Sequence, residues 1–151
     1  MSEWTRIIEA AGLAQGPGQA AGRALLLECW ESTSPVEHAR RCVLAHYLAD
    51  TETDLDAEIA WDVRALEEHR FMADADLAPL GIGSAAGFRP SLELNLADGY
   101  HRRGEPDRAR EHLDRGRAAV DALGDDGYGT MIRRGLDALE RRMADPVATD
   151  G

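Results

Sequence analysis

The stretch LADGYHRRGEPDRAREHLDRG, residues 96–116, decides the fold. Apolar and small residues recur at helical spacing on both sides of a short break, RRGEP. Gly104 can end the first helix in a left-handed conformation, and Pro106 suits the first position of the next helix. Because the connection is so short, the stretch predicts an antiparallel helical hairpin.

Small residues at matching places explain how these two helices pack. Ala97 in the first helix and Ala109 in the second allow a close approach of the two backbones. Tyr100 and Leu113 fill the space beside this approach. The order of a small residue, a tyrosine, a glycine and another small residue within residues 91–120 resembles one unit of the tetratricopeptide repeat, a helical hairpin of about 34 residues.

A second copy of the pattern lies 52 residues earlier in the chain. The shift places Leu44, Ala45, Leu48, Ala57 and Trp61 on Leu96, Ala97, Tyr100, Ala109 and Leu113. The earlier copy has Leu48 in place of the tyrosine and Glu52 in place of the turn glycine. The offset is larger than the length of one repeat because a segment rich in glycine and proline, residues 72–90, lies between the copies.

The composition predicts an all-α chain, because Leu and Ala dominate its apolar residues and no run alternates with the period of a strand. The resemblance then implies one domain of about seven helices, a short tetratricopeptide-like α-solenoid built from antiparallel hairpins. The expected parts are a degenerate hairpin at about 2–33, a repeat at about 34–70, a loop at 71–89, a repeat at about 90–123 and a capping helix at about 128–144.

Two helix features are specific enough to test. Ser34 as N-cap, Pro35 at the first position and Glu37 three residues after the serine predict a capping box at the start of a helix. The expected last helix has an apolar stripe that includes Ile132 and Leu136, with arginines beside it. Such a helix suits either the cap of a repeat array or a membrane surface, and we favour the cap.

The charge of the chain restricts its partners. The net charge is −11, from 28 acidic residues and 17 basic residues, all of which are arginine. Residues 1–88 are the more acidic part, with 15 acids against six arginines. Such a chain repels nucleic acids and anionic membranes, so we expect neither as a partner.

The cysteines and the apolar segments predict a cytoplasmic protein. Cys29 and Cys42 lie within helical patterns, which favours reduced thiols over a disulfide framework. No segment approaches the length and apolarity of a membrane span, and residues 1–13 lack the pattern of a signal peptide.

The resemblance also predicts where a ligand binds, because the first helix of each hairpin lines a concave groove in this family. The residues expected on that face are Cys42, His46, Ala49 and Asp50 in one repeat and Leu94, Asn95, Asp98, His101 and Arg102 in the other. The family's clamp for acidic C-termini needs several basic groove residues, and here Arg102 is the only arginine among the expected groove residues, beside Asp50 and Asp98. We therefore expect a basic or apolar protein or peptide, or a second copy of the chain.

Three other patterns lack what their chemistry requires. His38, Cys42, His46 and Asp50 are metal-ligand types spaced four residues apart, but His38 and His46 lie about 12 Å apart along a helix, too far to share one ion. The acids in residues 50–58 lack the glycine and final glutamate of a calcium loop. The glycines in residues 81–87 do not follow a strand, as a phosphate-binding loop must. We predict no metal and no cofactor.

These observations favour a non-enzymatic interaction module without catalytic residues. The alternative is an enzyme or a small-molecule sensor, with a pocket between the helices expected at about 34–50, 54–70 and 90–103. His46, Asp98 and His101 would then supply its polar groups. A closed pocket where His46 and Asp98 converge favours the alternative, and an open concave surface favours the interaction module.

Overall fold

Seven α-helices and three short 3-10 helices make up residues 2–145, the part of the chain that this computed structural model describes. The α-helices are α1 (Glu3–Ala14), α2 (Gln19–Ser32), α3 (His38–Asp50), α4 (Leu55–His69), α5 (Arg89–Arg102), α6 (Pro106–Ala118) and α7 (Gly127–Ala144). The 3-10 helices are η1 (Asp74–Leu80), η2 (Ala86–Phe88) and η3 (Val120–Ala122). No strand occurs in residues 2–145, so the predicted all-α fold class is confirmed.

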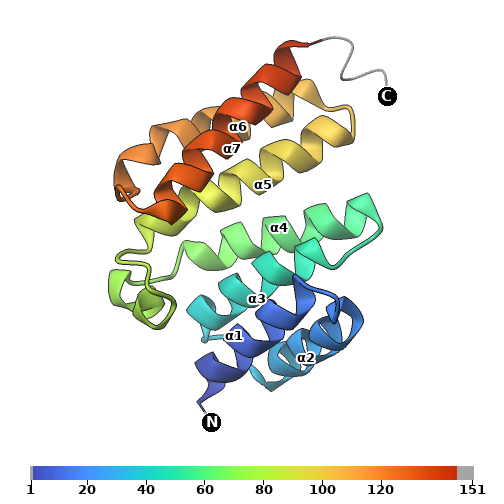
Figure 1. Cartoon of the computed structure of the whole chain (residues 1–151), viewed down its shortest axis with the longest axis vertical. Coiled ribbons are helices and arrows are strands. Elements are labelled where there is room, and N and C mark those ends of the chain that lie inside the picture. The colour runs from blue at the N-terminus through green and yellow to red at the C-terminus, as the bar shows by residue number, and fades with distance from the viewer. Residues whose placement is uncertain (1, 146–151) are drawn as a thin grey trace.

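The α-helices pack as neighbouring pairs that stack in chain order. The pairs α1–α2, α3–α4 and α5–α6 are antiparallel hairpins, and α7 lies on the last one (Figure 1). Helix α3 packs against α2, and α4 packs against α5, so each hairpin meets the next. The resulting stack is a short α-solenoid, as expected from the hairpin pattern.

The α5–α6 turn has the geometry that its sequence predicts. Gly104 has a φ of +80°, which is the left-handed region that favours glycine. Its backbone N–H donates to the His101 carbonyl, and the N–H of Glu105 donates to the Tyr100 carbonyl at 2.9 Å. These two bonds form a Schellman motif. Pro106 then begins α6 directly.

The small residues of the α5–α6 hairpin are fully buried. Ala97 and Ala109 both have no exposed surface, and Leu113 beside them has none either. A larger side chain at either alanine would therefore need the helices to move apart. The predicted close approach of α5 and α6 depends on these positions.

The earlier copy follows the pattern in its first helix but not in its second. The α3 positions that match the pattern, Leu44, Ala45 and Leu48, are fully buried. In α4, however, Ala57 and Trp61 are partly exposed, and Ile59 and Ala65 are buried instead. Helix α4 packs against α5 as well as α3, so its buried face differs from that of α6.

The predicted start of the third helix is wrong by one turn. Helix α3 begins at His38, and residues 34–37 form a turn in which the Glu37 N–H donates to the Ser34 carbonyl. The Glu37 carboxylate accepts from the Ser34 N–H at 2.5 Å, so one of the two capping-box bonds is present. The Ser34 side chain does not cap the helix, because the chain is still turning out of α2 at this point.

The segment predicted as a loop is more ordered than expected. It contains η1 and η2, and two hydrogen bonds of Ala85 hold it in place, one to α4 and one within the segment to η1. The His69 Nε2 atom donates to the Ala85 carbonyl at 2.6 Å, and the Ala85 N–H donates to Asp74 Oδ1 at 3.2 Å. The segment lies beside one end of the helices, where it is drawn in green (Figure 1).

Helix α7 uses its apolar stripe for packing. Ile132, Leu136 and Leu139 are buried where α7 contacts α5 and α6. Helix α6 ends at Ala118, earlier than predicted, and η3 leads into α7. None of the helices in residues 2–145 has the length and apolarity needed to cross a membrane. The stripe is buried within the fold, as packing of α7 on the last hairpin requires.

Candidate functional site

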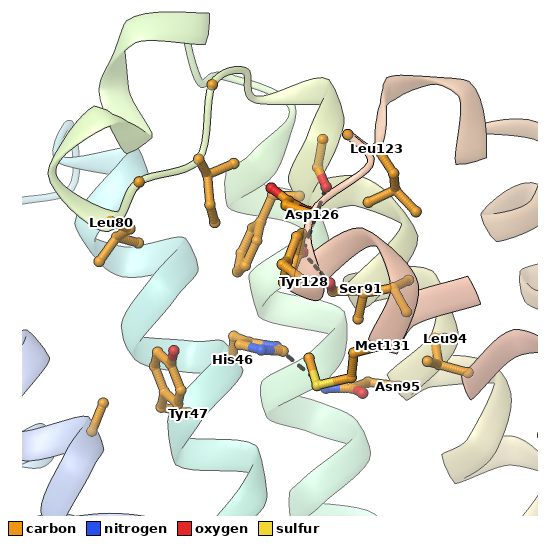
Figure 2. Close-up of a pocket in the computed structure, with 18 of the residues that line it drawn as sticks. His46, Tyr47, Leu80, Ser91, Leu94, Asn95, Leu123, Asp126, Tyr128 and Met131 are labelled. Carbon is orange, nitrogen blue, oxygen red and sulfur yellow. Dashed lines mark hydrogen bonds between the residues drawn. The ribbon is translucent and has the colours of Figure 1, made fainter. Parts of the chain in front are cut away.

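The side of the stack formed by the first helix of each hairpin carries a groove of about 1160 Å³. Its walls come from α1, α3, α5 and α7. Residues 79–84, with Gly87 and Phe88, close it at one end (Figure 2). Among the described residues that line the groove, none belongs to α2, α4 or α6.

The groove walls are mainly apolar. The lining aliphatic and aromatic side chains are Ile7, Ile8, Tyr47, Leu80, Ile82, Phe88, Leu94, Leu123, Tyr128, Met131 and Ile132. Ile8 is 45% exposed and Met131 is 59% exposed, which is high for side chains of this size. Such apolar surface in a hollow typically marks a place where another molecule binds.

A polar contact between α3 and α5 crosses the floor of the groove. The Asn95 Nδ2 atom lies 3.3 Å from His46 Nδ1, and the two side chains face each other in Figure 2. The His46 ring meets the rings of Tyr47 and Phe88 edge to face, with centroids 5.2 and 5.1 Å away. Burial lowers the pKa of His46 to about 4, so the ring is neutral at pH 7.

A buried carboxyl group lies next to this contact. Asp62 of α4 is only 3% exposed, and its Oδ1 atom has no hydrogen-bond partner among the described residues. Burial, with a smaller effect from the charges of Glu58 and Asp50, raises the pKa of Asp62 to about 8 against the opposing effects of Arg102 and Asn95. At pH 7 this carboxyl group is therefore mostly protonated.

The charged groups of the groove are acidic. Of the described residues that line it, Asp50 and Asp126 are acids and none is an arginine. Asp50 is exposed, and partial burial together with the charge of Glu58 raises its pKa. Asp126 also caps α7, because its Oδ1 accepts from the Gly129 N–H at 2.8 Å. The groove therefore offers negative charge to a ligand.

The structure brings four of the predicted site residues together. His46, Asp50, Leu94 and Asn95 all line the groove. Ala49, also predicted to face the groove, is buried and does not line it. Cys42, predicted to face it as well, is fully buried in the core between the hairpins and does not reach the groove surface. Burial raises the pKa of its thiol.

The other three predicted residues lie on the last turns of α5, beyond the groove. Asp98 pairs with Arg102 at 2.9 Å and with Arg142 of α7 at 3.1 Å. Arg102 also pairs with Glu58 of α4. His101 does not line the groove. The groove lies over the first half of α5, next to η2, so these later residues do not reach it.

The groove also contains residues that the sequence did not single out. Ile7 and Ile8 of α1, Tyr128 and Met131 of α7, and Ser91 of α5 line it. The hydroxyl groups of Ser91 and Tyr128 are hydrogen bonded to each other and so join α5 to α7 (Figure 2). The sequence contains one sign of this, because Met131 is an apolar residue outside the stripe that α7 uses for packing. Such a residue is available to bind another molecule.

The alternative pocket was predicted in a different place. It was expected between the helices now seen as α3, α4 and α5, with His46, Asp98 and His101 converging. Of these three residues only His46 lines the groove, and Asp98 is held in ion pairs outside it. The groove instead follows the first helices of the hairpins and α7.

The part of the chain that the structure describes contains neither a disulfide nor a metal site. Cys29 and Cys42 are free and buried. Within residues 2–145, no group of three His, Cys, Asp or Glu side chains is arranged to hold a metal ion. Comparison with known proteins finds no matching family model, no matching curated protein and no matching solved structure.

Proposed function

We propose that this chain is a non-enzymatic, tetratricopeptide-like interaction module that binds an apolar, basic segment of a partner protein in its groove. The observation that carries the proposal is the make-up of the groove, whose apolar walls come from the first helices of all three hairpins and whose charges are acidic. Stacked hairpins present an extended concave surface of this kind for binding.

The size of the groove favours a polypeptide segment over a small molecule. Pockets for drug-sized ligands enclose roughly 300 to 1,000 Å³. The groove encloses about 1160 Å³ and extends over four helices that are far apart in the sequence. A segment of chain fills such a surface, with several apolar side chains in contact at once.

The charge of the groove favours a basic segment. Asp50 and Asp126 line it without an arginine among the described lining residues, and the whole chain has a net charge of −11. Positive charge on a partner therefore speeds association and adds specificity. A second copy of this acidic chain, a nucleic acid or an anionic membrane fits the groove poorly for the same reason. The buried free thiols suit the reducing cytoplasm, where we expect the module to act.

Selection from a random peptide library displayed on phage tests this proposal. We expect the wild-type chain to enrich peptides that combine apolar and basic residues. Met131→Asp places a charge on the apolar groove wall and should abolish the enrichment. Val36→Asp is the matched control, because Val36 is 77% exposed and lies outside the groove.

Two results would contradict the proposal. One is enrichment by Met131→Asp of the same peptides as the wild type. The other is an equal loss of enrichment in Val36→Asp, which would place the binding surface elsewhere on the molecule.

A further inference from the structure

The groove has an acidic corner where α3, α4 and α5 meet. Asp50 of α3 lines the groove, and Asp62 of α4 lies buried next to Asn95 of the groove floor. The groups that act on Asp62 are Asp50 from α3, Glu58 from its own helix, and Asn95 and Arg102 from α5. Two of the three charged groups are acids, so the corner is negative.

Arg102, the one basic residue within the described chain that acts on Asp62, is already shared. It pairs with both Glu58 and Asp98. Neither Asp50 nor Asp62 forms an ion pair with any residue among 2–145. The Asp62 Oδ1 atom is buried without a hydrogen-bond partner among these residues, which is unfavourable. Such an atom in a folded protein calls for an explanation, and a bound ligand or ion is one.

The groove floor at this corner adds no positive charge. The His46 ring is neutral at pH 7, and its Nδ1 atom accepts from the Asn95 amide. A cation placed beside Asp50 therefore meets an uncharged ring and a polar amide, with the buried carboxyl group of Asp62 next to that amide. It would offset the repulsion between Asp50 and Glu58 and would favour the charged form of Asp62.

We propose that Asp50 and Asp62 form a subsite for one cationic side chain, a guanidinium or ammonium group, of the segment bound in the groove. This inference rests on the function proposed above and names the partner residue that the groove selects. Asp50 contacts the cation at the groove surface. Asp62 acts from behind the Asn95 amide by giving its proton to the solvent and becoming an anion.

The experiment uses the peptide most enriched on the wild-type chain in the phage selection. It is synthesised with arginine at its enriched basic position and again with citrulline, which has nearly the same shape without the charge. Wild-type protein should bind the citrulline peptide about tenfold more weakly. In Asp50→Asn and in Asp62→Asn this difference should shrink to about threefold or less, as expected of a coupled pair.

A second measurement tests whether Asp62 loses its proton when the peptide binds. Calorimetric titration at pH 7 in buffers of different ionisation enthalpy should show proton release when the wild-type chain binds the arginine peptide. Binding of the citrulline peptide should release less, and Asp62→Asn should remove the release for both peptides. A merely structural role for Asp62 would leave the number of released protons independent of the charge of the peptide.

The outcomes separate this inference from the function on which it rests. Enriched peptides without a conserved basic position, or an undiminished citrulline effect in both variants, would overturn the cation subsite and leave groove binding intact. Enrichment that is insensitive to Met131→Asp would overturn groove binding itself. A citrulline effect that falls in both variants, with proton release lost in Asp62→Asn, is the result that we expect.

Discussion

The Asn95 amide joins α5 to α3 by its contact with His46, whose Nδ1 atom lies 3.3 Å from Asn95 Nδ2. The contact links two hairpins that are joined in the chain through α4 and a long connection. It also forms the floor of the groove next to the buried Asp62. One amide therefore serves the packing of the hairpins and the polarity of the binding surface.

Removing this amide should destabilise the fold. Asn95→Ala leaves the His46 Nδ1 atom without its partner in a mainly apolar setting, at an expected cost of about 1 to 3 kcal/mol in the free energy of unfolding. Asp98→Ala is the control on the same helix and removes partly exposed ion pairs, which contribute roughly 0 to 1 kcal/mol. Urea denaturation measures both changes in the free energy of unfolding. Equal losses in the two variants would contradict a stabilising role for the Asn95–His46 contact.

The buried carboxyl group predicts how stability changes with pH. The pKa of Asp62 is about 8 in the folded chain against an ordinary 3.8. Between these values the folded chain keeps a proton that the unfolded chain loses, so stability falls as pH rises through this window. Asp62→Asn removes this effect and should make the chain about 1 to 3 kcal/mol more stable at pH 8.

The difference between Asp62→Asn and wild type is the quantity to measure, because other titrating groups cancel in it. His46 has the opposite effect, since its lowered pKa means that stability is lost as pH falls from about 6.5 to about 4. The difference in unfolding free energy should grow between pH 4 and pH 8. A difference that stays constant across this range would contradict the raised pKa of Asp62.

The close approach of α5 and α6 predicts a steric effect. Ala109 is fully buried, so Ala109→Leu should overpack the hairpin and cost about 1 to 3 kcal/mol. The neighbouring Arg108 is exposed, and Arg108→Leu is the matched control with little expected effect. An unchanged urea midpoint for Ala109→Leu would show that the helices have room for a larger side chain.

The turn glycine and a helical glycine should respond in opposite directions to the same substitution. Gly104→Ala forces a β-carbon into the left-handed region at φ +80° and should cost about 1 kcal/mol or more. Gly12 lies inside α1 with open space around its α-carbon, so Gly12→Ala should stabilise the chain by about 0.5 to 1 kcal/mol. Thermal melts of both variants measure the contrast, and stabilisation by Gly104→Ala would contradict the Schellman turn.

The parts of the fold that the sequence predicts are those with local causes. Gly104 and Pro106 specify a turn through their own backbone preferences, so the hairpin around them could be placed from the sequence. The buried face of α4 could not be predicted in this way. It depends on packing against α5, and the spacing of residues within α4 does not indicate that contact. The same applies to Ser34, whose capping role is displaced by the turn that leads out of α2.

The candidate site shows the same division. His46, Asp50 and Asn95 were found because they share the outward face of the first helices. The reach of the groove along α5 depends on where η2 and α7 close it, so the predicted residues Asp98 and Arg102 lie outside. The contributions of α1 and α7 depend on the curvature of the whole stack, which the sequence of one hairpin does not contain.

Mapping the bound peptide on the protein tests the central claim most directly. Backbone amide chemical shifts of the labelled chain are followed by NMR while the most enriched peptide is added. The groove proposal predicts that the largest changes fall on lining residues of α1, α3, α5 and α7, including Ile8, Asp50, Asn95 and Met131. Changes concentrated on α2, α4 and α6, with the groove residues unmoved, would contradict it.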